Sequence, residues 1–296
     1  MLAGAMTALI TPFRDGRLDD ARLKEQVERQ IKGGVSGVVP VGTTGESPTL
    51  SVEEHERVIE LTVNVAAGRV KVIAGTGANA TNEAVELHRH AKSVGADACL
   101  SVNPYYNKPS QEGLYRHFMT LSEAVDLPIV LYNIPGRTGI TMSAATVARL
   151  HKNGNFIAIK EATGSCDLAS EIRTLCDITI VSGDDSLTLP LMSIGATGVI
   201  SVLSNLLPEV VSSLVEKFRR GDLAGAEAVH RKHFQLTRSL FFDGNPAGIK
   251  CAMQLAGLDT GELRLPLVEA GEETRAAIAG HLHTLGVEQG IGRGVA

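Results

Sequence analysis

The stretch FIAIKEATG, residues 156–164, carries four apolar residues straight into Lys160 and then reaches a glycine. An apolar run of this length that ends at a turn signal is typical of a strand buried on both faces. The ammonium group of a lysine in such a place must give up most of its hydration, which is costly. Either the strand ends first and Lys160 reaches solvent or pairs with Glu161, or the lysine stays desolvated at the strand end. In the second case burial lowers its pKa and leaves a neutral amine that can attack a carbonyl.

Apolar runs of the same kind recur along the chain, and helical patterns alternate with them. Runs rich in Val and Ile that precede helices indicate parallel strands covered on both faces. Eight such units in roughly 220 residues favour a (β/α)8 TIM barrel over a doubly wound sheet. The expected strands are residues 5–13, 35–41, 70–74, 98–103, 129–134, 156–160, 178–181 and 198–202. The expected helices are residues 20–32, 52–67, 82–94, 111–125, 144–151, 187–194 and 208–219.

After Gly221 the alternation stops and only helical patterns remain, at about residues 223–242, 247–255 and 273–285. Glycine and proline separate these helices, and no linker composition interrupts the chain. We therefore expect a catalytic barrel in residues 1–222 and a C-terminal helical region in residues 223–296.

The composition favours a small-molecule ligand. Of 296 residues, 44% are hydrophobic and 21% are charged, and the formal net charge is −5 with the basic residues scattered. This charge pattern predicts neither a binding surface for nucleic acid nor one for anionic membranes. The cysteines form no C-x-x-C pair and follow no cationic leader or long apolar span, so we expect reduced thiols in a cytoplasmic protein. They are Cys99, Cys166, Cys176 and Cys251.

Chemistry-bearing side chains follow the expected strands, where a barrel of this kind builds its active site. They are Thr11, residues 42–46, residues 75–77, residues 103–106, residues 132–138, residues 160–161 and residues 182–185. Because the carboxyl ends of parallel strands meet at one rim, hydroxyls, one lysine and one arginine converge there.

This set suits carbonyl chemistry. An amine that forms an imine must be neutral, so the pKa of Lys160 must fall from about 10.4 toward roughly 7 to 8, through desolvation and a nearby cation such as Arg137. Tyr132 hydrogen-bonded to the Thr44 hydroxyl is a plausible proton relay. Backbone amides of the turn at residues 42–45 can hold one carboxylate, and the Arg137 guanidinium can hold a second.

Each feature also has a purely structural explanation. The turn at residues 42–45 can simply join a strand to a helix capped by Ser51, Tyr132 can close the barrel top, and Arg137 can pair with a surface carboxylate. Asp184 and Asp185 lack a third convergent ligand, so capping is favoured over a metal site. His88 and His90 lie two residues apart on a helix and therefore face different directions.

Two rival functions follow from other features. Residues 75–80 match G-x-G-x-x-A, the dinucleotide-binding fingerprint, and Asp97 follows about 20 residues later. Asp97 comes before the expected strand at residues 98–103 and not after it. It therefore lies at the end of the sheet opposite to the one where a dinucleotide would bind. A non-catalytic binding barrel is the second rival, and a covalent adduct between Lys160 and a ketoacid would exclude it.

Three motifs together resemble the pyruvate-dependent class I aldolase family: GTTGE at residues 42–46, YNIPGRT at 132–138 and IKEA at 159–162. The resemblance runs from about Ala5 to about Leu267. It implies that pyruvate, bound as a lysine Schiff base without any cofactor, condenses with L-aspartate 4-semialdehyde to give 4-hydroxy-tetrahydrodipicolinate. This is the first committed step of diaminopimelate and lysine biosynthesis. A pyruvate-forming lyase or aldolase of a sugar acid is the alternative, which Arg137 and the Tyr105-Tyr106 pair disfavour.

The resemblance also implies roles for single residues. Lys160 is the Schiff-base lysine, Tyr132 transfers protons, and Thr44 bridges Tyr132 to Tyr106. In this family the residue at Tyr106 enters the neighbouring subunit's site, which implies a dimer at least and a homotetramer as the expected assembly. Thr43 and the Gly45 region bind a carboxylate, Arg137 binds the semialdehyde carboxylate, and Gly183 and Ile200 contribute backbone contacts near the lysine.

The resemblance also implies a regulatory site, and the sequence departs from the family's pattern at one position of a C-terminal motif. In lysine-inhibited relatives a pocket at the dimer interface corresponds to Ser47, His55, Asn79, Glu83 and Tyr105, whereas Val52 stands where some of them have a histidine. Residues 245–250, NPAGIK, depart from the usual N-P-x-P-x-K at Gly248. We expect this departure to touch a helix start and not the chemistry.

Overall fold

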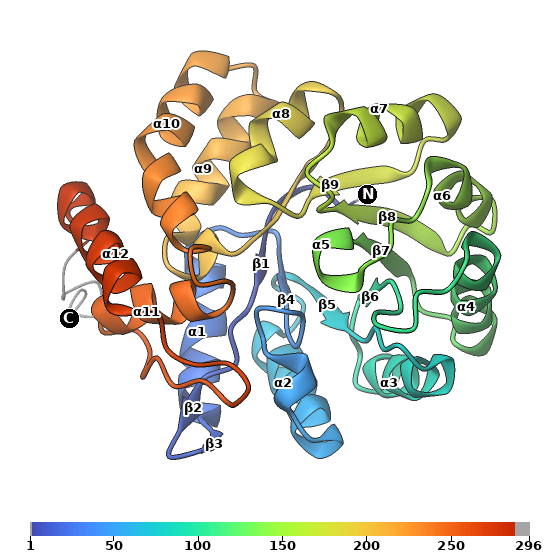
Figure 1. The fold of residues 1–296 in the computed structure, drawn as a ribbon, viewed down its shortest axis with the longest axis horizontal. Coiled ribbons are helices and arrows are strands. Elements are labelled where there is room, and N and C mark those ends of the chain that lie inside the picture. The colour runs from blue at the N-terminus through green and yellow to red at the C-terminus, as the bar shows by residue number, and fades with distance from the viewer. Residues whose placement is uncertain (1, 288–296) are drawn as a thin grey trace.

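The computed structural model describes residues 2–287 and closes eight parallel strands into a barrel ringed by helices (Figure 1). The strand order is β1-β10-β9-β8-β7-β6-β5-β4, and β4 pairs with β1 to complete the ring. The predicted (β/α)8 barrel is therefore confirmed. The barrel strands are β1 (Gly4–Ala8), β4 (Gly37–Val39), β5 (Lys71–Gly75), β6 (Ala98–Val102), β7 (Ile129–Asn133), β8 (Phe156–Glu161), β9 (Thr179–Ser182) and β10 (Gly198–Ser201).

Helices follow the strands along the chain, and all but the short α5 cover the barrel from outside (Figure 1). They are α1 (Asp20–Lys32), α2 (Val52–Ala66), α3 (Thr81–Ser93), α4 (Gln111–Ala124), α5 (Pro135–Thr138), α6 (Ala144–His151), α7 (Cys166–Leu175), α8 (Thr188–Ser193) and α9 (Pro208–Arg219). The sequence did not predict α5 or α7. Helix α7 buries Ala169 and Ile172 in the outer core.

The first two strands are shorter than expected. Strand β1 ends at Ala8, and the chain then forms a small hairpin of β2 (Phe13–Arg14) and β3 (Arg17–Leu18). Strand β4 ends at Val39, two residues before Val41 enters the left-handed region at φ 49°. A β-branched residue rarely adopts that conformation. The left-handed backbone at Val41 ends the extended strand, and the turn at residues 42–46 follows it.

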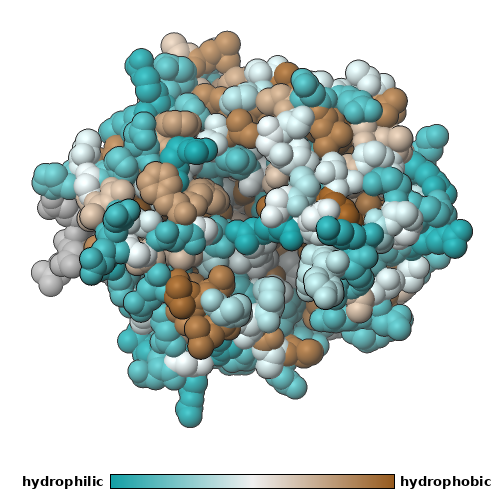
Figure 2. Space-filling model, viewed as in Figure 1, coloured by the Kyte–Doolittle hydropathy of each residue, from teal (hydrophilic) through white to brown (hydrophobic). Residues whose placement is uncertain are grey.

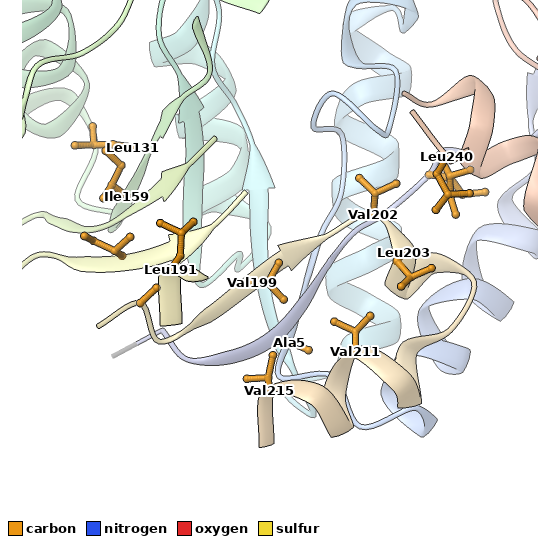
Figure 3. Close-up of a cluster of buried hydrophobic side chains, with 14 of the residues drawn as sticks. Ala5, Leu131, Ile159, Leu191, Val199, Val202, Leu203, Val211, Val215 and Leu240 are labelled. Carbon is orange, nitrogen blue, oxygen red and sulfur yellow. The ribbon is translucent and has the colours of Figure 1, made fainter. Parts of the chain in front are cut away.

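Side-chain alternation separates the barrel interior from the outer core. On β7, Val130 and Tyr132 belong to the interior cluster, whereas Leu131 belongs to the cluster under the helices. On β8, Ala158 faces the interior, so Lys160 two residues later faces it as well. Figure 3 shows the outer layer, in which Val199 and its neighbours pack against the helix that follows β10.

The C-terminal region packs against one flank of the barrel (Figure 1). It contains α10 (Leu223–Ser239), α11 (Ala247–Leu255) and α12 (Glu272–Leu285). Helix α10 contacts α9, and α12 contacts both α10 and α11. The expected boundary after residue 222 stays a prediction, and residues 288–296 of that region lie outside the described residues.

The visible face is mostly polar, with apolar side chains in small separate groups (Figure 2). Within residues 2–287, none of the helices combines the length and apolar character that crossing a membrane requires. The four cysteines named above are free of disulfides.

Candidate active site

Lys160 lies near the end of β8, buried inside the barrel mouth with 6% of its surface exposed. It stands beside Tyr132 in the strand register, and its Nζ lies 4.2 Å from the centroid of the Tyr132 ring. Among the described residues, no hydrogen bond or ion pair reaches this ammonium. The neighbouring Glu161 carboxylate accepts instead from the Thr163 amide at 2.7 Å, and burial raises the pKa of that carboxyl. The interpretation in which Lys160 reaches solvent or pairs with Glu161 is therefore wrong.

Gly183 confines the lysine side chain. A Cβ added to Gly183 would lie 3.0 Å from both Cγ and Cε of Lys160 and 2.7 Å from the Ala162 Cβ. Real Cβ contacts are rarely this short, so only glycine leaves the lysine its present path. Ile200 lies on β10, is fully buried and belongs to the same interior cluster as Tyr132.

The turn at residues 42–46 lies above β4, between two residues in the left-handed region. These are Val41 at φ 49° and Glu46 at φ 55°. Backbone conformations of this kind cost energy and cluster at functional sites. The Gly45 amide donates to the Gly42 carbonyl at 3.1 Å, so it is used within the turn. Within the part of the chain described, the Thr43 and Thr44 amides have no such partner, which makes them the donors available to an anion.

Thr44 is 3% exposed and is held from the C-terminal region. Its Oγ1 accepts a hydrogen bond from the Asn245 Nδ2 at 2.9 Å. The described residues contain no hydrogen bond between the Thr44 and Tyr132 hydroxyls, so the expected direct relay contact is not formed in this state. The motif at residues 245–250 contains Asn245, but its sequence alone predicted no role for that residue.

Arg137 lies on α5, the short helix after β7. Its Nη2 donates to the Asn245 carbonyl at 3.0 Å, so its partner is a backbone oxygen and not a surface carboxylate. A cavity of about 220 Å³ brings Arg137 together with Thr43 and Tyr132. The cavity is lined by Val41, Gly42, Thr43, Ser47, Pro48, Gly75, Gly77, Leu100, Val102, Tyr105, Tyr132, Ile134, Arg137 and Thr138.

The two adjacent tyrosines after β6 differ in their surroundings. Tyr105 lines the cavity, and burial together with the negative charge of Glu83 raises the pKa of its phenol. Tyr106 is 90% exposed and holds its backbone in the left-handed region at φ 72°. A bulky residue in that conformation is uncommon. The structure therefore does not bring Tyr106 into the cavity of its own chain.

The residues expected to bind lysine only partly converge. Ser47 and Tyr105 line the cavity, and Glu83 lies exposed on α3 close enough to Tyr105 to act on its pKa. The Asn79 carbonyl accepts from the side-chain Nδ2 of Asn107 at 2.8 Å. His55 is different, because it is 4% exposed and burial lowers its pKa to about 4.

The remaining candidates take structural positions. The Asp184 carboxylate caps the 3-10 turn η2 (Asp185–Leu187). The buried Asp185 carboxylate accepts from the Ser201 hydroxyl and from the Val202 amide. Asp97 holds Lys71 at the first residue of β5, which confirms that it lies at the opposite end from the site.

The structure also confirms that His88 and His90 face different directions and that Ser51 caps the helix after the turn. His88 is buried and donates to the Ala84 carbonyl at 2.7 Å, whereas His90 reaches the Glu56 carbonyl on the neighbouring helix α2. Ser51 caps α2 in a reciprocal pair with Glu54. Within residues 2–287, no three His, Cys, Asp or Glu side chains gather in a way that could hold a metal ion.

Barrel enzymes of the class I aldolase type hold their substrates as imines on a lysine, and the rim of this barrel presents one buried amine beside a phenol. The model of the dihydrodipicolinate synthetase family matches residues 1–285, and the chain belongs to that family.

Similar proteins match this chain over nearly their whole length. The 4-hydroxy-tetrahydrodipicolinate synthase of Pelobacter propionicus is 50% identical over 289 residues, covering 97% of this chain and 100% of the relative. The crystal structure of dihydrodipicolinate synthase from Aquifex aeolicus has 46% identity and a TM-score of 0.95, covering 97% and 99% of the two chains. The chloride-inhibited dihydrodipicolinate synthase of Acinetobacter baumannii, complexed with pyruvate, has 43% identity and a TM-score of 0.94 over 97% and 100%.

Proposed function

We propose that the chain condenses pyruvate with L-aspartate 4-semialdehyde through a Schiff base on Lys160 and forms 4-hydroxy-tetrahydrodipicolinate. The observation that carries the proposal is a buried lysine that lies against a phenol at the barrel rim and has no carboxylate partner among residues 2–287. Full-length relatives that bear the name of this synthase support the choice of substrates, and none of those reported above is named for a sugar acid.

The first half of the reaction builds the nucleophile. The Lys160 amine attacks the keto carbon of pyruvate, water leaves, and an imine forms. The Thr43 and Thr44 amides bind the pyruvate carboxylate at the turn. Loss of a proton from the pyruvate methyl group then gives an enamine, and the phenol of Tyr132, whose ring lies beside Lys160, accepts and returns protons.

The second half forms the carbon–carbon bond. The enamine carbon attacks the aldehyde of the semialdehyde, whose carboxylate the Arg137 guanidinium binds at the cavity edge. The substrate's amino group then attacks the former keto carbon and releases the Lys160 amine as the ring closes. Protons move through Tyr132, Thr44 and Tyr106. The imine on Lys160 accepts the electron pair released from the methyl C–H bond, so the proposed route needs no bound cofactor.

Borohydride trapping tests the lysine. Wild-type protein incubated with pyruvate and borohydride should gain one reduced pyruvate adduct in an intact mass spectrum, and Lys160→Ala should gain none. Lys152→Ala, at the exposed end of α6, is the matched control and should react like the wild type. Turnover with L-aspartate 4-semialdehyde then separates the synthase from a sugar-acid aldolase. A wild type without an adduct would overturn the proposal.

We propose further that Tyr106 acts in the site of a neighbouring subunit in an oligomer, with a tetramer as the expected assembly. Its 90% exposure supports this role, because a phenol so placed cannot serve its own cavity. Mixing inactive Lys160→Ala subunits with impaired Tyr106→Phe subunits tests it. Mixed oligomers contain sites with both native residues and should regain activity, whereas a Tyr106 that acts within its own chain predicts none.

The lysine site of inhibited relatives is a second proposal for Ser47, His55, Asn79, Glu83 and Tyr105. The exposed Glu83 carboxylate beside Tyr105 supports it, since a carboxylate can bind the ligand's ammonium group. Calorimetric titration with lysine should show binding that Glu83→Gln weakens by about tenfold or more. Glu86→Gln, which removes a carboxylate paired with Arg89 on the same helix, should leave the affinity unchanged.

A further inference from the structure

We infer that Asn245 is a positioning residue for the condensation and connects the proton-relay half of the site to the carboxylate-binding half. The inference rests on the proposed function for its kinetic consequences. Its side-chain Nδ2 donates to the Thr44 Oγ1 at 2.9 Å, and its main-chain carbonyl accepts from the Arg137 Nη2 at 3.0 Å. Thr44 and Arg137 come from different barrel units, and a residue far along the chain holds both.

The contact to Thr44 leaves the hydroxyl hydrogen of that residue available for donation. A hydroxyl carries one hydrogen and two lone pairs, so an amide that donates to the oxygen leaves the hydroxyl hydrogen free to donate elsewhere. Thr44 is thereby set to give a hydrogen bond toward a phenol oxygen while it receives one from Asn245. The Asn245 Oδ1 is buried and has no hydrogen-bond partner among the described residues, so the amide is held chiefly through its donor side.

A buried ion pair anchors the same two segments. Glu46 closes the turn that carries Thr44, and Lys250 lies on α11 five residues after Asn245. The Lys250 Nζ lies 2.5 Å from the Glu46 Oε1, and both side chains are fully buried. The Lys250 ammonium also donates to the Glu262 carbonyl at 2.7 Å. The turn and the Asn245 segment are thus joined at two points, which limits the movement of Thr44 relative to Asn245.

Steady-state kinetics of Asn245→Ala test the positioning role against a merely structural one. We expect kcat to fall about 100-fold, because an unoriented hydroxyl transfers protons poorly. The KM for the semialdehyde should change by less than about threefold, because the carbonyl that holds Arg137 remains. Gln254→Ala is the matched control, since it removes a side-chain amide that donates to the Thr260 carbonyl in the same region. It should keep the wild-type kcat.

Asn245→Asp separates donation from shape. A carboxylate of the same size accepts hydrogen bonds but cannot donate one, so it should lose kcat as Asn245→Ala does. Wild-type kcat in either variant overturns the inference, as does a loss of kcat no larger than the loss of folded protein in a thermal melt.

Crystal structures of Asn245→Ala and Gln254→Ala decide the matter without reference to the reaction. The Thr44 hydroxyl should leave its present position in the first variant and keep it in the second. A Thr44 that stays in place overturns the inference even if activity falls. If instead wild-type protein forms no pyruvate adduct, the proposed function fails while these structures still show whether Asn245 holds Thr44.

Discussion

Two buried lysines, Lys160 in the barrel and Lys250 in the C-terminal region, both lie against aromatic rings and differ in the acceptors around the ammonium group. Each places its Nζ over an aromatic ring, at 4.2 Å from the Tyr132 centroid and 4.3 Å from the Phe13 centroid. Lys250 has the Glu46 carboxylate at 2.5 Å, whereas Lys160 has no carboxylate partner among residues 2–287. Burial and aromatic contact therefore do not distinguish a structural lysine from a reactive one. The presence or absence of a carboxylate beside the ammonium group does distinguish the two lysines.

The environment of Lys250 is built to keep its charge. Burial lowers its pKa, and the adjacent Glu46 opposes that shift. Arg264 lies on the Phe13 ring as well, at 4.3 Å, and its backbone amide donates to the Glu46 Oε2 at 3.1 Å. The mouth of the barrel offers Lys160 no comparable set of acceptors, which leaves its nitrogen available to a substrate.

The largest expected effect comes from Lys160→Met. Without the nitrogen no imine forms, so kcat should fall by at least about 10⁴-fold. The fold should become more stable by about 1 kcal/mol, because an uncompensated polar group leaves an apolar interior. Urea unfolding and the condensation assay measure the two effects on one preparation. A destabilised Lys160→Met would show that Lys160 contributes to the fold as Lys250 does.

Lys250→Met should have the opposite effect on stability. It leaves the Glu46 carboxylate buried without its partner, which costs about 3–5 kcal/mol. The double variant Glu46→Gln/Lys250→Met should recover part of that loss, because no unpaired charge remains. Lys217→Met, which breaks the half-exposed pair with Asp222, is the control and should cost no more than about 1 kcal/mol. Equal losses for the buried and exposed pairs would contradict the comparison.

The lysine that we propose as reactive could be found from the sequence, whereas the one in the buried ion pair could not. Strand periodicity places Lys160 near the end of β8, and barrel topology then dictates that the side chains after each strand meet at one rim. The same rules locate Tyr132 and the turn that carries Thr44. These inferences use only local patterns and one property of parallel barrels.

The contacts that support the site lie beyond local patterns. Thr44 and Asn245 are 201 residues apart, and nothing in the spacing of either motif indicates that they meet. The expected bond from Thr44 to Tyr132 is not formed among the described residues, because it depends on how two separate segments place their side chains, which neither motif encodes. The Gly45 amide donates to the Gly42 carbonyl within the turn, a pairing that the motif alone does not reveal. Motifs therefore predicted which residues gather, and the structure was needed to pair their atoms.

Gly183→Ala probes how closely the lysine is held. The new Cβ would lie 3.0 Å from two carbons of Lys160, so the side chain must shift. A displacement approaching 1 Å should slow imine formation about 100-fold. Gly136→Ala is the control, because a Cβ there meets nothing within 4 Å although α5 borders the cavity. Rapid-mixing measurements of pyruvate binding compare the two variants, and equal rates would mean that Lys160 does not need this confinement.

Buried histidines extend the comparison to bases that lack a counter-charge. Burial lowers the pKa of His55, His88 and His117 from 6.5 to about 4 in each case. Between these values the unfolded chain binds more protons than the folded one, so the stability that the neutral rings contribute is complete above pH 6.5 and is lost as the pH falls toward 4. Each ring should cost about 2 kcal/mol at pH 5. Urea unfolding of wild type and His55→Leu at pH 7.5 and pH 5 measures the share of one ring, and the variant should lose about 2 kcal/mol less than the wild type between the two values. If both proteins lose the same free energy of unfolding, protonation of the His55 ring does not limit stability. The interior would then tolerate a charged base without a carboxylate partner better than the contrast between Lys160 and Lys250 implies.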